Sequence, residues 1–158
     1  MNRNLARALQ VVVVIAGVGL LFAEAVIIPV VSGWMAAEFP EFEWARWPLA
    51  IPLILVLACV QVALVATWKL LGRVARDEIF NSGARRWVNT ILAALGTGWG
   101  IAFVTSAWQT TQNASAPWIV MMELLALLVG LTVLLLIIVL RGLLNQATEL
   151  KTEMDAVV

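Results

Sequence analysis

The sequence predicts an all-α membrane protein with four transmembrane helices in one bundle, both termini in the cytoplasm, and an amphipathic C-terminal helix. Composition is the first reason: 63% of the 158 residues are hydrophobic and 13% are charged, whereas about 25% of residues are charged in an ordinary soluble domain. The lengths of the apolar stretches and the placement of the basic residues are the other two. A water-soluble fold is excluded.

Four apolar stretches occupy most of the chain, at residues 11–31, 49–68, 88–108 and 118–140. Each is close to the length of about 20 residues that a helix needs to cross about 30 Å of hydrocarbon. The hydrophilic pieces leave no room for a separate soluble domain. Residues 1–158 are therefore expected to form one four-span domain, with a cytoplasmic tail at 141–158.

The first stretch also has features of a signal peptide. Arg3 and Arg7 precede it, and Ala23-Glu24-Ala25 imitates a cleavage site. The apolar run nevertheless continues through residues 26–28. This continuation favours a retained span over a discarded leader.

The basic residues are placed asymmetrically around the four stretches. Of the 10 lysines and arginines, only Arg46 lies between the first and second stretches, on the side that also carries Glu38, Glu41 and Glu43. The others precede the first stretch, surround the connection between the second and third, or follow the fourth. Under the positive-inside rule, this bias places both termini and the middle connection in the cytoplasm.

Tryptophan gives a second check on orientation, because its amphipathic ring prefers the boundary between headgroups and hydrocarbon. The residues expected at the outer boundary are Trp34, Trp44, Trp47, Trp108 and Trp118, and those expected at the inner boundary are Trp68 and Trp87. Only Trp99 falls in the middle of a stretch. We interpret the tryptophans as anchors rather than as surfaces that stack a ligand.

Two acids, Glu24 and Glu123, lie within the apolar stretches. An ionised group at the centre of a span costs about 3 kcal/mol even on lenient insertion scales, so an intramembrane acid is a functional candidate. The helical rise places the two acids at matching depths of about 9 Å and about 7.5 Å from the outer ends of their spans. Gly17 and Gly130 share a helical face with Glu24 and Glu123 respectively. Both acids are therefore expected to point into the bundle.

No lysine, arginine or histidine lies at that depth to neutralise Glu24 or Glu123. The acids would therefore be protonated, share a proton, hold a cation, or accept hydrogen bonds from donors such as Gln61, Thr105 or Trp108. The functional interpretation is a proton or cation site that includes Glu24, Glu123 and Gln61. The simpler interpretation, which we favour, is a neutral, hydrogen-bonded acid that joins helices or opens to the outer interface.

The glycines of the third stretch bear on helix packing, and the single cysteine bears on disulfide and metal sites. Gly96 and Gly100, with Gly98 between them, let another helix approach the third stretch, either within the chain or from a second copy. A homo-oligomer is thus permitted. Cys59 is the only cysteine and histidine is absent, so we expect no internal disulfide, no metal site and no cofactor.

The connection between the second and third stretches is strongly basic, with a turn around Asn81-Ser82-Gly83. Its basic residues are best interpreted as setting topology and attracting anionic lipid, at about 1 kcal/mol each near the surface. The alternative is that the connection binds a cytoplasmic partner. The candidate residues for that role are Arg73, Arg76, Asp77, Glu78, Ile79, Phe80, Arg85 and Arg86.

The tail is predicted to form an amphipathic helix, with an apolar stripe made of Leu143, Ala147, Leu150, Met154 and Val157. Leu143, Leu150 and Met154 are candidate partner-binding residues. The tail is net acidic, so an anionic membrane surface should not attract it. A protein surface is the better target, either the basic connection of the same chain or a separate cytoplasmic protein.

Several segments together resemble a known family. They are Trp68-Lys-Leu-Leu, Arg76-Asp-Glu-Ile-Phe-Asn-Ser, Arg86-Trp-Val-Asn and Leu140-Arg-Gly-Leu-Leu-Asn-Gln-Ala-Thr. They are similar to the bacterial membrane family called domain of unknown function 2975, especially its actinobacterial members, and the similarity extends over nearly the whole chain. The resemblance implies four spans with both ends inside and no known reaction. It also implies genes often found beside that of a small helix-turn-helix regulator.

The leading hypothesis is a non-enzymatic regulatory or interaction protein of the bacterial cytoplasmic membrane. Its partners would be the lipid bilayer and a soluble protein such as a helix-turn-helix transcription regulator, without direct contact to nucleic acid. The alternative is a small proton- or cation-coupled transporter that uses the intramembrane acids. An enzyme is least expected, because the chain has no histidine, no serine or cysteine beside a plausible base, and no phosphate-binding glycine loop.

Overall fold

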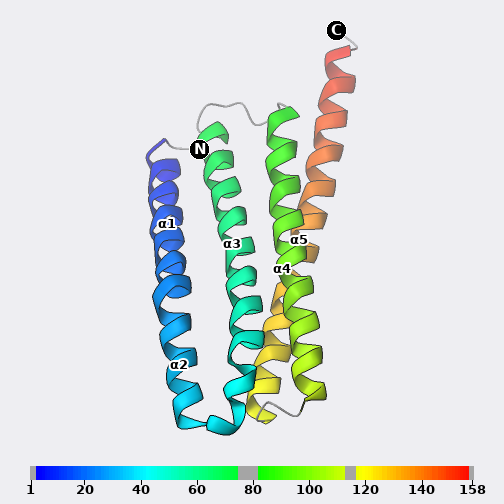
Figure 1. The fold of residues 1–158 in the computed structure, drawn as a ribbon. Coiled ribbons are helices and arrows are strands. Elements are labelled where there is room, and N and C mark those ends of the chain that lie inside the picture. Colours follow the sequence, from blue (N-terminus) through cyan, green and yellow to red (C-terminus); the bar gives the residue numbers. More distant parts are fainter. Residues whose placement is uncertain (1–2, 75–81, 113–116, 157–158) are drawn as a thin grey trace.

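The computed structural model of the chain is built from helices over the residues that it describes, 3–74, 82–112 and 117–156 (Figure 1). In chain order, the elements are α1 (Arg3–Phe22), the π-helical turn η1 (Ala23–Ile27), α2 (Ile28–Glu38), the 3₁₀ turn η2 (Pro40–Ala45), α3 (Arg46–Val74), α4 (Ser82–Thr111) and α5 (Pro117–Ala156).

Four helical stretches in this part of the chain are long and apolar enough to cross a membrane. They are Arg7–Glu38, Glu43–Gly72, Arg86–Thr111 and Ile119–Leu143. The first combines α1, η1 and α2, and the other three lie in α3, α4 and α5, with α3's stretch beginning inside η2. The prediction of an all-helical chain with four membrane-length helices is confirmed.

Proline explains both the irregular turn in the first span and the start of the last helix. In η1, the backbone N–H of Ile28 donates to the carbonyl of Ala23, five residues back. The next residue, Pro29, has no N–H with which to continue an α-helical ladder, so the helix passes through a wider turn just before it. Pro117 opens α5, where the first N–H of a helix has no partner in any case.

The helices pack in chain order: α3 packs against α1 and α4, and α4 packs against α5. The start of α1 and the end of α5 lie at the same end of the molecule, together with the end of α3 and the start of α4 (Figure 1). We call this the tail end. The opposite end, where η2 lies and α4 stops, is the hairpin end.

Few of the described side chains are buried, and the buried apolar ones are small. They are Ala45, Ala50, Ala63 and Ala66, all in η2 or α3. Large apolar side chains lie on the outside instead, such as Ile15 at 65% exposure and Leu124 at 68%. A helix that packs closely through alanine and faces outward with large apolar residues is suited to hydrocarbon surroundings.

Glycine marks the closest helix approaches, but not where the small-xxx-small step predicts them. A Cβ added to Gly98 would lie 3.1 Å from the Cβ of Cys59, so α3 and α4 meet at this residue. A Cβ added to Gly96 or Gly100 would meet nothing within 4 Å. The prediction of a close contact at Gly96 and Gly100 is therefore wrong within the chain, because these two residues lie on other faces of α4 than Gly98. Contact with a second copy stays a prediction.

The tail is helical as far as the structure describes it. Helix α5 continues from the end of its apolar stretch at Leu143 to Ala156, and it extends beyond the other helices at the tail end (Figure 1). Leu143 is 56% exposed. Leu150 and Met154 lie on this helix, but the structure does not describe their side chains. Val157 lies outside the described residues.

Candidate functional site

Glu24 joins the first span to α3. The Gln61 Nε2 donates a hydrogen bond to Glu24 Oε2 at 2.8 Å, and both side chains are half-buried. The turn η1 carries the acid and α3 carries the amide. The sequence named Gln61 among the donors for the acids, and this hydrogen bond confirms it.

The other carboxylate oxygen of Glu24, Oε1, is buried and has no hydrogen-bond partner among the described residues. A buried oxygen without a donor is costly in an apolar setting, and a bound proton would lower that cost by removing the charge. The acid lies in a π-helical turn, a local structure found often at functional sites. One oxygen of Glu24 is therefore left without a described donor inside the helix pair.

Glu123 forms the corresponding contact between α4 and α5. The hydroxyl of Ser106 donates to Glu123 Oε2 at 3.0 Å, and Glu123 is half-buried. A carboxylate has about four acceptor positions on its two oxygens, so one neutral donor does not exhaust it. Glu123 can accept further hydrogen bonds or face a positive charge.

The two acids are bound to different pairs of helices. Glu24 and Gln61 connect the first span to α3, whereas Glu123 and Ser106 connect α5 to α4. None of the contacts described for these residues joins one acid to the other. The structure therefore brings together Glu24 with Gln61, and the shared site of both acids stays a prediction.

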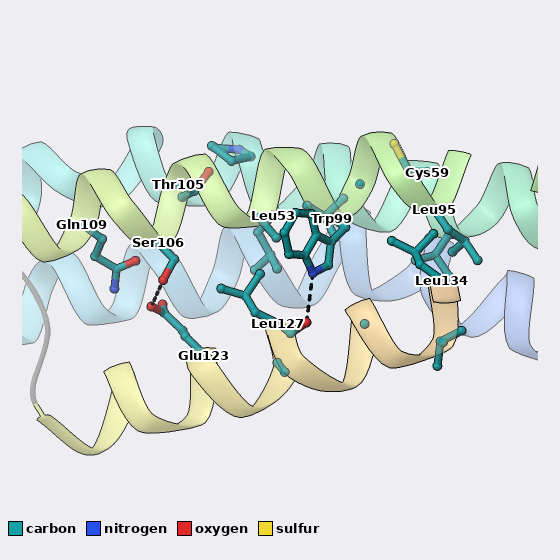
Figure 2. A pocket seen from close by; sticks show the side chains of 18 of the residues that line it. Leu53, Cys59, Leu95, Trp99, Thr105, Ser106, Gln109, Glu123, Leu127 and Leu134 are labelled. Carbon is teal, nitrogen blue, oxygen red and sulfur yellow. Dashed lines mark hydrogen bonds between the residues drawn. The ribbon is translucent and has the colours of Figure 1, made fainter. Parts of the chain in front are cut away.

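A cavity of about 580 Å³ lies between α3, α4 and α5, and Glu123 forms part of its wall (Figure 2). Its polar residues gather toward the hairpin end: Thr105, Ser106, Gln109 and Glu123. Leu53 and Leu127 lie beside Trp99 in the middle of the wall, and Leu95, Leu134 and Cys59 lie toward the other end. The cavity is thus a long apolar space with a carboxyl group near one end.

Trp99 fixes the middle of this cavity. Its Nε1 donates to the backbone carbonyl of Leu127 at 2.9 Å, and its ring stacks on Phe103 with a centroid distance of 5.4 Å. A Cβ added to Gly130 would lie 3.1 Å from Trp99 Cδ1, so the ring also lies against α5. The mid-stretch position expected for Trp99 is confirmed, but the anchoring interpretation given to the tryptophans as a group does not hold for it, because its indole N–H donates to α5 inside the helix pair.

The other tryptophans for which the structure describes contacts lie near the two ends. Trp44 packs edge-on to Trp108 with centroids 5.9 Å apart, and Lys69 lies 5.1 Å from the ring centroid of Trp87. Among the exposed tryptophans, Trp34 has the largest exposed fraction, 71%. Exposed or end-lying rings fit the predicted anchoring role.

Arg46, the one basic residue predicted on the outer side, lies against α2. Its Nη2 is 3.5 Å from the carbonyl oxygen of Pro29, and its guanidinium lies 5.1 Å from the ring centroid of Trp47. A Cβ added to Gly33 would come within 2.9 Å of Nη2, so glycine leaves the room that this arginine occupies. Arg46 thereby ties the start of α3 to the end of the first span.

Sequence reasoning missed Ser106 and Gln109. Ser106 is the donor that Glu123 uses, and Gln109 is buried, with 7% exposure, in the cavity wall. Thr105, which the sequence suggested as a donor, gives its hydroxyl to the carbonyl of Ile101. The depth of Ser106 was available as a signal, because α4 and α5 are antiparallel and both residues lie less than about two turns from their shared end.

The predicted partner-binding residues of the middle connection fall largely outside the described part of the chain. Arg76, Asp77, Glu78, Ile79 and Phe80 lie outside it. Arg73 is in the last turn of α3, and Arg85 and Arg86 are in the first turns of α4. Arg86 is exposed. Their role in binding a partner stays a prediction.

Among the described residues, no group of three or more cysteine, histidine or acidic side chains gathers in a way that could hold a metal ion. The described donors at the two acid sites are neutral, namely the Gln61 amide and the Ser106 hydroxyl. The two carboxyl groups can bind a proton, accept hydrogen bonds, or pair with a cationic group.

Comparison with known proteins identifies a family. No curated protein and no solved structure matches the chain. A family model described as protein of unknown function (DUF2975) matches residues 30–158. The match begins inside α2, so it includes Gln61, Ser106 and Glu123 but not Glu24. Because it covers most of the chain, including three of its four membrane-length helices in full, the chain belongs to the DUF2975 family.

Proposed function

We propose that this chain is a non-enzymatic regulatory membrane protein that binds a cytoplasmic partner at its tail end. The observation that carries the proposal is the continuity of α5. This single helix of 40 residues runs from Pro117 to Ala156 and passes the end of its apolar stretch at Leu143 without a break. Its last turns therefore extend from the bundle as a helix, beyond the length that the hydrocarbon layer would cover.

The distribution of charged residues supports the proposed orientation and the kind of partner. The positive-inside rule places the tail end in the cytoplasm of a bacterial plasma membrane. From Leu143 onward, the tail carries Glu149, Glu153 and Asp155 against Lys151, so a partner with a basic face suits it. A helix-turn-helix regulator is such a protein, and it would be held through its protein surface rather than through DNA.

The same helix gives the proposed regulation a physical route. Glu123 lies near the start of α5, beside the cavity, and the tail lies at the other end of the same helix. A shift of α5 at the cavity would therefore move the tail, since helix shifts of about 1–2 Å are a common means of switching.

Affinity capture from the host in mild detergent tests the tail. The full chain is expected to retain one soluble protein that is lost when Leu143–Val158 is deleted. A sharper pair of variants adds the same charge to each of the two faces: Leu150→Asp with Met154→Asp on the stripe, and Asn145→Asp with Thr152→Asp on the opposite, polar face. The stripe pair should lose the partner and the polar-face pair should retain it. Capture that survives deletion of the tail would refute its role.

A second candidate function is a small proton- or cation-coupled transporter. The observation that favours it is the buried, unpartnered Oε1 of Glu24, a carboxyl oxygen placed to take up a proton. Under this proposal, Glu24→Gln removes proton-coupled movement of a substrate in reconstituted vesicles, while Glu43→Gln, an exposed acid at the hairpin end, leaves it intact. Equal flux in Glu24→Gln and the unchanged chain would count against transport through this acid.

A further inference from the structure

We propose that the cavity between α3, α4 and α5 binds an amphipathic organic cation, with the charged group beside Glu123 and the apolar body along the leucine-lined wall. This binding goes beyond the proposed function, and it stands whether or not the tail binds a partner. Its evidence is the shape of the cavity, the charge of its wall and the fixed position of the residues that form it.

The size and polarity of the cavity suit a small organic ligand. Its volume of about 580 Å³ lies within the range of about 300–1,000 Å³ typical of ligand sites, which are mostly apolar with a few polar groups. Here the polar groups are gathered rather than scattered: Ser106, Gln109 and Glu123 lie toward one end (Figure 2). A ligand with one polar head and an apolar body matches this distribution.

The charge of the wall selects a cation. Glu123 is the only acidic residue among the described residues that line the cavity, and none of these is basic. Its described hydrogen bond comes from a neutral hydroxyl. An anionic ligand would be repelled, and a neutral apolar ligand would leave the carboxylate without a counter-charge. A cation would pair with it in surroundings of low dielectric constant, where opposite charges attract more strongly than in water.

The wall is held in place before any ligand arrives. Trp99 is bound to the Leu127 carbonyl and stacked on Phe103, and Gly98 lies in close contact with Cys59 of α3. The three helices that form the cavity are thus linked by contacts that do not involve Glu123. A preformed site loses less free energy on binding than one that must be ordered.

Binding of radiolabelled tetraphenylphosphonium to the full chain in lipid nanodiscs tests the inference. Tetraphenylborate, which has nearly the same shape and the opposite charge, is the matched probe. Empty nanodiscs are measured in parallel, because both ions also enter lipid. We expect saturable binding of tetraphenylphosphonium and no saturable binding of tetraphenylborate.

Two variants locate the binding. Glu123→Gln retains an oxygen that can accept the Ser106 hydrogen bond but removes the charge, and it should weaken binding at least about tenfold. Ala126→Trp fills the cavity from an exposed position on α5 and should abolish binding with Glu123 still present. The controls are Glu43→Gln, an exposed acid outside the cavity, and Leu124→Trp, a lipid-facing residue of the same helix at 68% exposure. Both controls should bind as the unchanged chain does.

Three outcomes would overturn the inference. They are equal binding of the two probes, binding unaffected by both Glu123→Gln and Ala126→Trp, and no saturable binding by the folded full chain. None of these bears on capture by the tail, so failure here is distinguishable from failure of the proposed function. Helical circular dichroism and a single size-exclusion peak for each variant show that loss of binding is not loss of fold.

Discussion

Single polar side chains join neighbouring spans in this protein. Gln61 reaches Glu24, Ser106 reaches Glu123, and Trp99 reaches the carbonyl of Leu127. Hydrogen bonds between membrane helices contribute about 0.6 kcal/mol on average and about 1.7 kcal/mol at most in measured cases. Removing one partner costs more when the other is left buried without a donor or acceptor. Individual polar residues therefore matter more here than the small buried core does.

Gln61→Leu is expected to destabilise the fold by about 1–2 kcal/mol. The substitution leaves both oxygens of Glu24 without a donor, because Oε1 already has none among the described residues. The measurement is the free energy of unfolding from a titration with sodium dodecyl sulfate in mixed micelles.

The double variant Glu24→Leu with Gln61→Leu is the control for this prediction. It removes the orphaned carboxyl group together with its donor, so it should recover most or all of the lost stability. If Gln61→Leu unfolds as easily as the double variant and both resemble the unchanged chain, the contact between η1 and α3 contributes nothing measurable.

At the residue scale, the sequence identified which acids matter better than it identified their partners. The cost of charge in hydrocarbon singles out Glu24 and Glu123 without any structure. Gln61 could be suggested because it is a polar residue inside an apolar stretch. Ser106 was missed because a hydroxyl in a helix ordinarily bonds its own backbone, as Thr105 does here, and only the packing of α4 on α5 turns one of the two toward the acid.

Helix pairs meet where glycine removes a side chain at the contact itself. Between α3 and α4, that residue is Gly98, which is buried against Cys59. The spacing of Gly96 and Gly100 is the same as in close-packed membrane dimers, yet these residues face away from the helices of their own chain. The spacing of the glycines shows only that one face of the helix carries small residues. The packing of the helices decides which face makes the contact.

Gly98→Ala is expected to destabilise the fold, whereas Gly96→Ala and Gly100→Ala should be neutral or stabilising by up to about 1 kcal/mol, the helix propensity gained. The new Cβ at Gly98 would meet a Cβ of α3 at 3.1 Å, and a Cβ cannot rotate away. Unfolding in sodium dodecyl sulfate checks the order of the three. A Gly98→Ala protein as stable as the other two would contradict the described contact. Destabilisation at Gly96 or Gly100 would instead indicate contact with a second copy.

At the element scale, the irregular turn before Pro29 was not predicted. Apolar periodicity continues through residues 11–31 and gives no sign of a wider turn, so the first span was expected as one regular helix. Pro29 lacks the N–H that would continue an α-helical ladder. A full π-helical turn, which carries Glu24, lies just before this proline. The lengths of the other helices followed from composition because hydrocarbon thickness fixes them.

Across the whole molecule, the start of α1, the end of α3, the start of α4 and the end of α5 lie at one end (Figure 1). We predict that this tail end faces the cytoplasm. The check uses Cys59→Ala as the background, with Gln146→Cys at the tail end and Glu41→Cys at the hairpin end, both exposed positions. A membrane-impermeant maleimide should label Glu41→Cys in intact cells and Gln146→Cys only in inverted vesicles. The reverse pattern would refute the orientation.

The number and type of spans were predictable for the whole molecule, but the cavity was not. Each span is set by its own residues, whereas the cavity depends on how α3, α4 and α5 are placed together. Cys59, Trp99 and Gly130 look unrelated in sequence, since they come from three different stretches. Only their packing makes them parts of one wall.

The order of packing has a consequence for biosynthesis. The spans that contact one another are successive along the chain: the first with α3, α3 with α4, and α4 with α5. The most extensive of the described helix contacts join successive spans, so each span can dock on its predecessor as the ribosome delivers it. Contacts between sequence neighbours also favour fast folding. Assembly of this protein can therefore proceed in the order of translation, with α5 and its tail added last.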